Sequence, residues 1–557
     1  MALASSVALV MTMAAGCGGG GGKSSKAKPK GHRGGTFTIL ATHPPSGGPD
    51  PAINYTLQLW QLSIDTHDGL VAFKRAGGTE GTKIVADLAE AVPKPTNGGK
   101  TWKFKVRRNI KYSDGTTMKP SDFKRTLERM FKVKGPTAGS FYQVFVGADK
   151  CLKTPATCDL SAAIVPDDKN YTLTFHLTGS DPEFLDKLAV PFAFVLPPST
   201  SMKEVAIPPP GTGPYKFVEY SSRKQMKLVR NPFFKEWSKD AQPDGSPDTI
   251  VEKFGLTVEA EVTQIENGQA DALSGADQVP ADRLPELSTK YADQVHVNPL
   301  TAVWYMSFNV RVPPFNNLKA RQGVNFATDH NALVKIYGGP KLAQPTCQIL
   351  PPNFPGYEPY CPYTKNPGAK WSAPDLAKAQ QLIAASGTKG APVKVNTDTN
   401  EVDKAIGLYF VGLLNKLGYK AELQALSPDI QYSFCQNSKN KVQFCFSSWY
   451  QDYPAASDFL NVLLGCASYV PNSDASPNLS EFCDKSTQAK IDQALKTGLT
   501  DPTKANKTWA QVDKDVVDKA VWVPIFNPKF VDLLSKRVKG YLFSPQWYFL
   551  IDQASVQ

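Results

Sequence analysis

The sequence predicts an α/β protein, because segments with strand-like alternation occur between segments with helical periodicity. Residues 101–106 alternate between polar and apolar side chains with period two, as a half-buried strand does. Residues 406–417 instead place apolar side chains three and four positions apart, and Gly418 fits the position that ends a helix. The 557 residues, 41% hydrophobic and 20% charged, are typical of a soluble globular chain with roughly three to four domain-sized units. This composition excludes a disordered protein and a membrane channel.

The first part of the chain contains strand patterns, a turn and a helix start. A turn is expected over residues 109–115, where Asp114 and Gly115 are residues of tight turns. Ser121 stands where the N-cap of a helix belongs, and apolar side chains then recur on one helical face. These side chains are Phe123, Leu127, Met130 and Phe131, and strands are expected at Gly35–Leu40, Thr101–Val106 and Tyr171–Leu177.

The N-terminal residues predict export from the cytoplasm. The apolar run of residues 3–13 is too short to span a bilayer, and small residues separate it from Cys17. We therefore expect a signal peptide over residues 1–16. A cysteine at this place resembles the lipobox of bacterial lipoproteins, which implies that Cys17 carries a lipid anchored in the outer face of the cell membrane. The alternative is an ordinary signal peptide followed by a chance cysteine.

Residues 17–34 are expected to form a flexible tether, because Gly, Ser, Lys and Pro cannot bury enough apolar surface to order this stretch. The chain carries a formal net charge of +11, and five of the positive charges lie in this tether. The remaining body keeps only +6, so we expect no nucleic-acid partner. The tether also resembles a phosphate loop at Gly22-Lys23-Ser24, but no strand precedes it, and no cofactor is expected.

The cysteines predict disulfides rather than a metal site. Removing Cys17 from the nine leaves an even number, no gap has the C-x-x-C spacing, and the six histidines are scattered. We expect each cysteine to pair with its neighbour along the chain, with free buried thiols as the alternative. The expected bridges are Cys151–Cys158, Cys347–Cys361, Cys435–Cys445 and Cys466–Cys483.

A series of short motifs follows in fixed order after Gly34. It includes Asp50-Pro51, Leu88-Ala-Glu90, Tyr112-Ser-Asp-Gly-Thr116, Gly211-Thr-Gly-Pro-Tyr215, Arg230-Asn-Pro232, Asn267-Gly-Gln-Ala-Asp271, Ser307-Phe-Asn309 and Arg321-Gln322. Together they resemble the family 5 extracellular solute-binding proteins, the oligopeptide- and dipeptide-binding components of ABC transporters. The resemblance implies a two-lobed periplasmic-binding-protein-like fold of type II, with an extra subdomain inserted in lobe I.

This resemblance also implies a division of the chain into lobes. Lobe I is expected to comprise residues 35–61, 198–298 and 519–557, with residues 62–197 as the inserted subdomain. Lobe II is expected over residues 299–518, and a closing strand pair near residues 521–534 should return the chain to lobe I. The glycines of residues 211–215 are expected to permit positive φ at the crossing.

One segment is expected to carry recognition, namely Ser447-Ser-Trp449-Tyr450-Gln-Asp452-Tyr453-Pro454. In the peptide-binding members a Trp-x-x-Asp-Tyr sequence of this kind lies in the interlobe cleft. The resemblance implies that Asp452 pairs with the α-ammonium group of the substrate, while Trp449, Tyr450 and Tyr453 supply apolar contact. The alternative is that Asp452 caps a turn before Pro454.

The function implied by the resemblance is that of a lipid-anchored, extracytoplasmic substrate-binding protein of an ABC importer. It would capture a peptide or a peptide-like amine-bearing solute between its lobes and deliver it to the permease, as a monomer and without a catalytic residue. The alternative is a secreted, lipid-anchored hydrolase acting on peptides or glycans. The sequence has neither G-x-S-x-G nor H-E-x-x-H, but a carboxylate pair formed in space leaves the hydrolase open.

Overall fold

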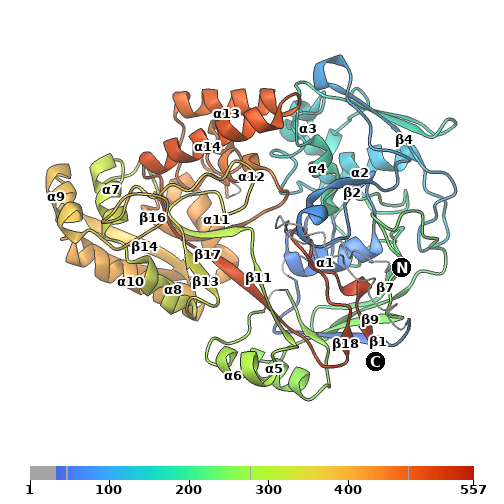
Figure 1. The fold of residues 1–557 in the computed structure, drawn as a ribbon. Coiled ribbons are helices and arrows are strands. Elements are labelled where there is room, and N and C mark those ends of the chain that lie inside the picture. The colour runs from blue at the N-terminus through green and yellow to red at the C-terminus, as the bar shows by residue number, and fades with distance from the viewer. Residues whose placement is uncertain (1–32, 46–47, 276, 475) are drawn as a thin grey trace, which may run out of the picture.

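The computed structural model describes residues 33–557 except 46–47, 276 and 475. The expected signal peptide, Cys17 and nearly all of the tether therefore lie outside the described residues. Figure 1 shows two bodies, each built around one large β-sheet, with a long strand running between them. Within the described part of the chain, no helix has the length and apolar character needed to cross a bilayer.

The first body contains a five-stranded sheet in the order β10-β1-β9-β8-β7. β1 lies in the sheet interior and pairs in parallel with both neighbours, so that Phe37 faces Ile250 and Ile39 faces Ala272. These four side chains are buried, as expected for a sheet that is covered by protein. The strands are β1 (Thr36–Ala41), β7 (Tyr215–Ser221), β8 (Gln225–Arg230), β9 (Thr249–Phe254) and β10 (Ala272–Leu273).

A smaller unit of the first body lies between β1 and β7 in the sequence. Its three-stranded sheet has the order β4-β6-β5 and packs against helix α2, which begins at Pro120. The N-cap is Lys119, whose backbone N–H donates to Asp122 Oδ2, so the prediction of Ser121 as N-cap was wrong. Pro120 explains the shift, because proline suits the first helical position, where no N–H partner is needed. The elements are β4 (Thr101–Lys105), β5 (Ile164–Asp167), β6 (Thr172–His176) and α2 (Pro120–Lys132), and the predicted face of Phe123, Leu127, Met130 and Phe131 is buried.

The second body contains a seven-stranded sheet in the order β11-β17-β12-β16-β14-β15, with β13 paired to β17. Helix α10 (Glu401–Lys416) packs on β14 and β15, and Gly418 follows it with φ of 94°, as expected for the end of a helix. The strands are β11 (Val295–Pro299), β12 (Ala302–Phe308), β13 (Ala343–Pro345), β14 (Pro392–Asp398), β15 (Lys420–Leu426), β16 (Phe444–Tyr450) and β17 (Trp522–Leu533).

β17 connects the two bodies. It is one continuous strand, antiparallel to β11, where the sequence suggested a closing strand pair. At its end Leu534 forms a bridge to Ala272 of the first sheet, so the same stretch of backbone contributes to both bodies. Figure 1 shows β17 and β11 as the crossing between them.

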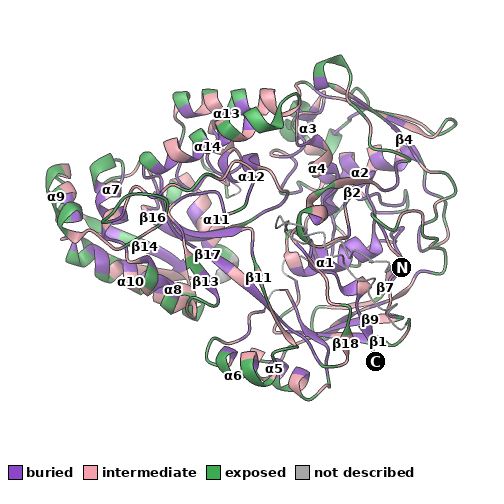
Figure 2. Cartoon of the chain, in the orientation of Figure 1, coloured by how far each residue is buried: buried purple, intermediate pink, exposed green. Residues whose placement is uncertain are grey.

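Further helices and short strands cover these sheets. Figure 2 shows that buried residues follow the strands, whereas exposed residues lie on the outer faces of α6, α9 and α13. The helices are α1 (Leu57–Thr66), α3 (Ala148–Lys153), α4 (Phe184–Leu188), α5 (Val258–Glu266), α6 (Leu284–Lys290), α7 (Leu318–Ala327), α8 (His330–Tyr337), α9 (Leu376–Ser386), α11 (Pro428–Gln436), α12 (Ala456–Leu460), α13 (Lys485–Gly498) and α14 (Pro502–Asp518). The short strands are β2 (Val71–Phe73), β3 (Ile84–Ala86), β18 (Val538–Lys539), β19 (Phe543–Ser544), β20 (Tyr548–Phe549) and β21 (Ser555–Val556).

The glycines of the segment 211–215 act by allowing close approach and not by positive φ. Neither Gly211 nor Gly213 has positive φ, so the predicted reason was wrong. A Cβ at Gly211 would overlap the carbonyl oxygen of Thr66, and one at Gly213 would lie 2.7 Å from that of Asp65. These glycines let the chain pass directly against the end of α1.

Disulfides hold neighbouring parts of the chain together, and one buried ion pair joins more distant parts. The four predicted disulfides are confirmed: Cys151–Cys158, Cys347–Cys361, Cys435–Cys445 and Cys466–Cys483. In addition, the guanidinium of Arg129 binds both oxygens of Asp50 at 2.8 and 2.5 Å, and neither side chain is exposed. A bidentate pair with no access to water is among the strongest polar contacts in proteins.

Candidate functional site

Asp452 lies where the two bodies meet. It follows β16 in the second body, and its side chain is 5% exposed. Its Oδ2 accepts a hydrogen bond from the hydroxyl of Tyr55, which precedes α1 in the first body. The side chain thus bonds to a residue 397 positions earlier in the chain instead of a neighbouring backbone N–H, which argues against a turn cap.

Asp458, on helix α12, joins Asp452 and Trp449. Its Oδ2 accepts the backbone N–H of Asp452 at 2.9 Å and the indole N–H of Trp449 at 3.4 Å. The side chain has no exposed surface, and its Oδ1 is buried without a hydrogen-bond partner. The sequence analysis missed Asp458. Its one signal was an acidic residue in the first turn of a short helix, a place where Asp is common for structural reasons.

Burial raises the pKa of both carboxyl groups. The pKa of Asp452 rises to about 7, and the hydrogen bond from the Tyr55 hydroxyl opposes this rise. The pKa of Asp458 is raised well above its usual range, first by burial and then by the charge of Asp452. Neither shift has a Lys or Arg among its main causes, and among the described residues no Lys or Arg forms an ion pair with Asp452 or Asp458. Buried carboxylates without a cationic partner leave room for a cation from outside the chain.

Two tyrosines of this region are partly exposed, namely Tyr55, which bonds to Asp452, and Tyr450 of the recognition segment. Tyr55 and Tyr450 each keep 39% of their surface exposed, although burial raises the pKa of both hydroxyls. The Tyr55 ring stacks on Trp60 at 5.6 Å, and the Tyr450 ring meets Trp304 at 5.4 Å. Rings that are surrounded by protein but keep open surface are suited to contact a ligand.

The four residues predicted to bind substrate do not all lie around one common point. Trp449 and Asp452 meet at Asp458, whereas Tyr450 turns toward Trp304 in β12. Tyr453 is 1% exposed and packs edge-on against Phe141 at 5.6 Å, in the core of the first body. Tyr453 therefore ties the recognition segment to the opposite body, and its contact with substrate stays a prediction.

Two disulfides flank the recognition segment. Cys435–Cys445 joins α11 to β16, and Cys466–Cys483 closes the loop that follows α12. Gln431 of α11 adds a hydrogen bond at 2.9 Å to the carbonyl oxygen of Phe446. β16, the strand that leads to Asp452, is therefore held to α11 by a disulfide and by a hydrogen bond.

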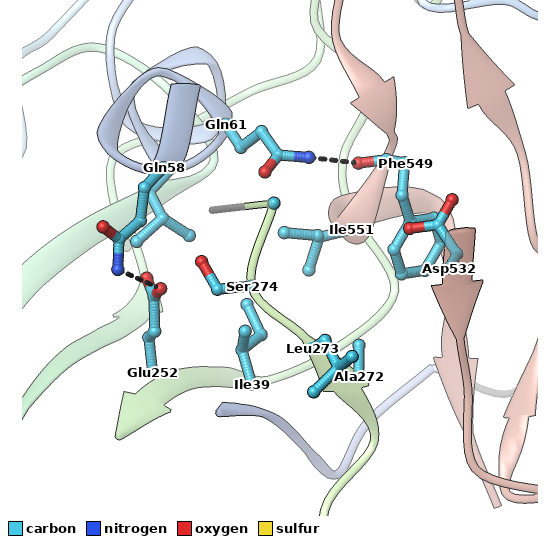
Figure 3. Close-up of a pocket in the computed structure, with 12 residues that line it drawn as sticks. Ile39, Gln58, Gln61, Glu252, Ala272, Leu273, Ser274, Asp532, Phe549 and Ile551 are labelled. Atoms are coloured by element: carbon cyan, nitrogen blue, oxygen red, sulfur yellow. Dashed lines mark hydrogen bonds between the residues drawn. The ribbon is translucent and has the colours of Figure 1, made fainter. Parts of the chain in front are cut away.

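Two pockets elsewhere do not include the recognition segment. One lies under α1 in the first body, where Gln58 donates to Glu252 at 2.7 Å (Figure 3). Its volume of about 10 Å³ suits about one water molecule. The other is an open pocket of about 620 Å³ beside β11 and β18, with Lys290, Lys536 and Lys539 among its lining residues. Within the described ranges, no group of three or more His, Cys, Asp or Glu side chains could hold a metal ion.

Comparison with known proteins identifies the family. The model of the bacterial extracellular solute-binding proteins, family 5 Middle, matches residues 83–470. The probable D,D-dipeptide-binding periplasmic protein DdpA of Escherichia coli (strain K12) is 24% identical over 511 residues, which are 89% of this chain and 89% of that protein. The dipeptide-binding protein of the same organism is 24% identical over 526 residues, which are 89% and 90% of the two chains.

Solved structures show the same fold. The clavulanic acid biosynthesis oligopeptide binding protein 2 has a TM-score of 0.85 at 23% identity, covering 95% of this chain and 96% of that chain. The Haemophilus influenzae OppA complex with RPPGFSPFR has a TM-score of 0.73 at 19% identity, covering 94% and 99%. The mixed α/β architecture in two lobes is thus the type II fold of periplasmic binding proteins, as the sequence predicted. Because the family model matches more than half of the chain, the protein belongs to the bacterial extracellular solute-binding proteins of family 5, and it is a binding protein and not an enzyme.

Proposed function

We propose that this protein binds a peptide, or a peptide-like solute with a primary amine, between its two lobes and delivers it to the permease of an ABC importer. The observation that carries the proposal is the buried Asp452, which has a second carboxyl group beside it and no cation among its described partners. A substrate ammonium group would supply the missing charge. Relatives that are named as dipeptide-binding proteins support a peptide as the solute.

The contacts of Asp452 also suggest how capture would work. Tyr55 from one lobe and Asp452 from the other are hydrogen-bonded to each other, and the Tyr55 ring keeps exposed surface at this contact. An ammonium group that enters would bind Asp452 while the rings cover the apolar part of the solute. Trp449 would act through apolar contact and through its hydrogen bond to Asp458.

The division into lobes belongs to this proposal. The strands of the five-stranded sheet fall within the predicted lobe I segments 35–61 and 198–298, and β18 and β21 fall within 519–557. The β4-β6-β5 sheet falls within the proposed subdomain 62–197. β11 and β17 pair within the seven-stranded sheet of lobe II, and we propose that they form the hinge.

Calorimetric titration tests the amine contact. A panel of short peptides that begins with dialanine would be titrated into wild type and Asp452→Asn, each with the free and the N-acetylated peptide. Asp452→Asn should weaken binding of the free peptide by roughly 2–5 kcal/mol, because one partner of a buried charge pair is lost.

Acetylation provides the control for this test. It should reproduce the loss in wild type and add little in Asp452→Asn, because both changes remove the same contact. Equal affinity of the two proteins for the free peptide would instead show that Asp452 does not bind the amine. A neutral or sugar-like solute would then be the better proposal.

We further propose that Cys17 anchors the protein to the outer face of the cell membrane, where it serves the permease as a monomer. The small residues before Cys17 and the Gly-, Ser- and Lys-rich stretch after it support this proposal. Cells fed an alkyne fatty acid should label the wild-type protein and leave Cys17→Ala unlabelled. Label on both proteins, or on neither, would contradict the anchor.

A further inference from the structure

The open pocket beside β11 and β18 is built from backbone that the fold holds in place. It lies between the end of α6, the start of β11 and the segment after β17, and its volume of about 620 Å³ suits a small molecule. The backbone N–H of Leu534 donates to the carbonyl oxygen of Gln294 at 2.9 Å, which joins two sides of the pocket. On another side β18 pairs with β21, so that Lys539 lies opposite Ser555.

The side chains around this pocket carry an excess of positive charge. Three lysines, Lys290, Lys536 and Lys539, line it together with one acidic residue, Asp293. Lys539 Nζ donates to the carbonyl oxygen of Lys536 at 2.9 Å, and within the described ranges neither of these two lysines forms an ion pair. Lys290 lies 3.8 Å from Glu286, in a contact between two exposed side chains. Positive charges around one pocket repel each other, so an anion bound there would stabilise them.

The type of cation at the pocket favours phosphate as the anion. Arg537 stands between Lys536 and Lys539 in the chain, but its Nε lies 3.7 Å from the buried Asp271 and its Nη1 donates to the carbonyl oxygen of Gly268. The forked guanidinium that suits a planar carboxylate is therefore engaged elsewhere, and lysines remain at the pocket. A phosphate group has several terminal oxygens, so separate ammonium groups can each bind one of them.

An aromatic contact fixes one further group at the pocket. The imidazole of His296 stacks on the ring of Tyr541 at 3.9 Å, and both residues line the pocket. The Tyr541 ring also packs on Phe549 at 5.2 Å, and its hydroxyl donates to Oδ2 of the buried Asp532 at 2.6 Å. The ring nitrogens of His296 make no hydrogen bond to any residue that the structure describes, so one of them can donate to a phosphate oxygen.

We propose that this pocket binds the phosphate group of a small solute or of a lipid headgroup, with the three lysines supplying positive charge and His296 a hydrogen bond. The proposal is independent of peptide binding, because no residue of the recognition segment lines the pocket. Failure of either proposal therefore leaves the other in place.

Calorimetric titration with two water-soluble probes tests the site and distinguishes the two sources. Glycerol 3-phosphate represents a free phosphorylated solute, and glycerophosphoglycerol represents the headgroup of phosphatidylglycerol. Tighter binding of the first probe would assign the pocket to a free solute, and tighter binding of the second would assign it to a lipid headgroup. If wild type binds neither probe, the proposal is wrong.

A pair of double variants shows whether binding depends on this pocket. Lys536→Gln/Lys539→Gln should weaken binding of the preferred probe about tenfold or more, because two positive charges next to the phosphate are lost. Lys404→Gln/Lys507→Gln is the matched control, since it removes two exposed lysines from the helices α10 and α14 of the second body. The control should bind as wild type does. Equal affinities of the two double variants would overturn the site.

The histidine resonances give a second readout that needs no variant at the lysines. His296 is assigned by the signal that disappears in His296→Gln, and the preferred probe should shift this signal in wild type. Burial lowers the pKa of His296 in the free protein, and a bound anion should raise it because the anion favours the imidazolium form. The buried His67 and His330 lie outside the pocket, and their signals should stay in place. A His296 signal that does not move at saturating probe would contradict the proposal.

Discussion

Asp452→Asn should stabilise the ligand-free protein at pH 8 while it weakens binding. In the folded protein burial raises the pKa of Asp452 from 3.8 to about 7. Between pH 3.8 and about 7, the folded protein therefore holds a proton on Asp452 that the unfolded chain has already released. The free energy of unfolding falls as the pH rises through this range. With about 1.36 kcal/mol for each pKa unit, ionised Asp452 costs the native state up to about 4 kcal/mol at pH 8.

The amide of Asn has nearly the same shape and carries no charge, so it avoids this cost. Urea unfolding of ligand-free wild type and Asp452→Asn at pH 5, 6, 7 and 8 measures the difference. The advantage of Asp452→Asn should be largest at pH 8 and shrink as Asp452 takes up its proton toward pH 5. A difference that stays constant with pH, or a wild type that is the more stable at pH 8, would refute the reasoning. Asp452 would then be solvated in the empty protein.

Three further substitutions test features of the fold and the site. Arg129→Leu leaves the buried carboxylate of Asp50 without its partner, and it should lower the free energy of unfolding by roughly 3–5 kcal/mol in urea titrations. Gly211→Ala puts a methyl group against the carbonyl oxygen of Thr66 and should cost roughly 1–3 kcal/mol by the same assay; an unchanged midpoint would show that the crossing can relax. Trp449→Ala should weaken peptide binding by roughly 1–3 kcal/mol whether or not the peptide is acetylated, because apolar contact is lost. A loss limited to the free peptide would assign Trp449 to the amine contact instead.

The strands, helices and disulfides of this protein could be predicted because the residues that indicate each of them lie close together in the sequence. The period-two alternation at residues 101–106 and the apolar face of α10 both report burial directly. The sequential disulfides were predictable for the same reason, since each bridge spans between 7 and 17 positions. The helix start at Pro120 was missed because Ser121 and Pro120 are competing signals one residue apart.

The site could be predicted only in part. The family resemblance pointed to Asp452, but its contact with Tyr55 joins residues 397 positions apart, and no local pattern reports such a pair. Asp458 carries no signal beyond its place in a helix start. The role of Gly213 was misjudged because a close approach depends on which element passes nearby, here the end of α1, and not on the backbone angles of the glycine.

The position of β17 has a consequence for the order in which the protein folds. β17 lies between β11 and β12 in its sheet, although it is made more than two hundred residues after both. Until residue 533 is available, β11 and β12 each present an unpaired edge that can capture another chain. Strands so far apart in the sequence pair slowly, because the entropy of closing the long intervening loop is lost before the strand contacts can stabilise it. A chaperone that covers the unfinished sheet should therefore raise the yield of folded protein most when it acts before the last twenty-five residues appear, and truncation before Trp522 should produce aggregates and not a smaller folded protein.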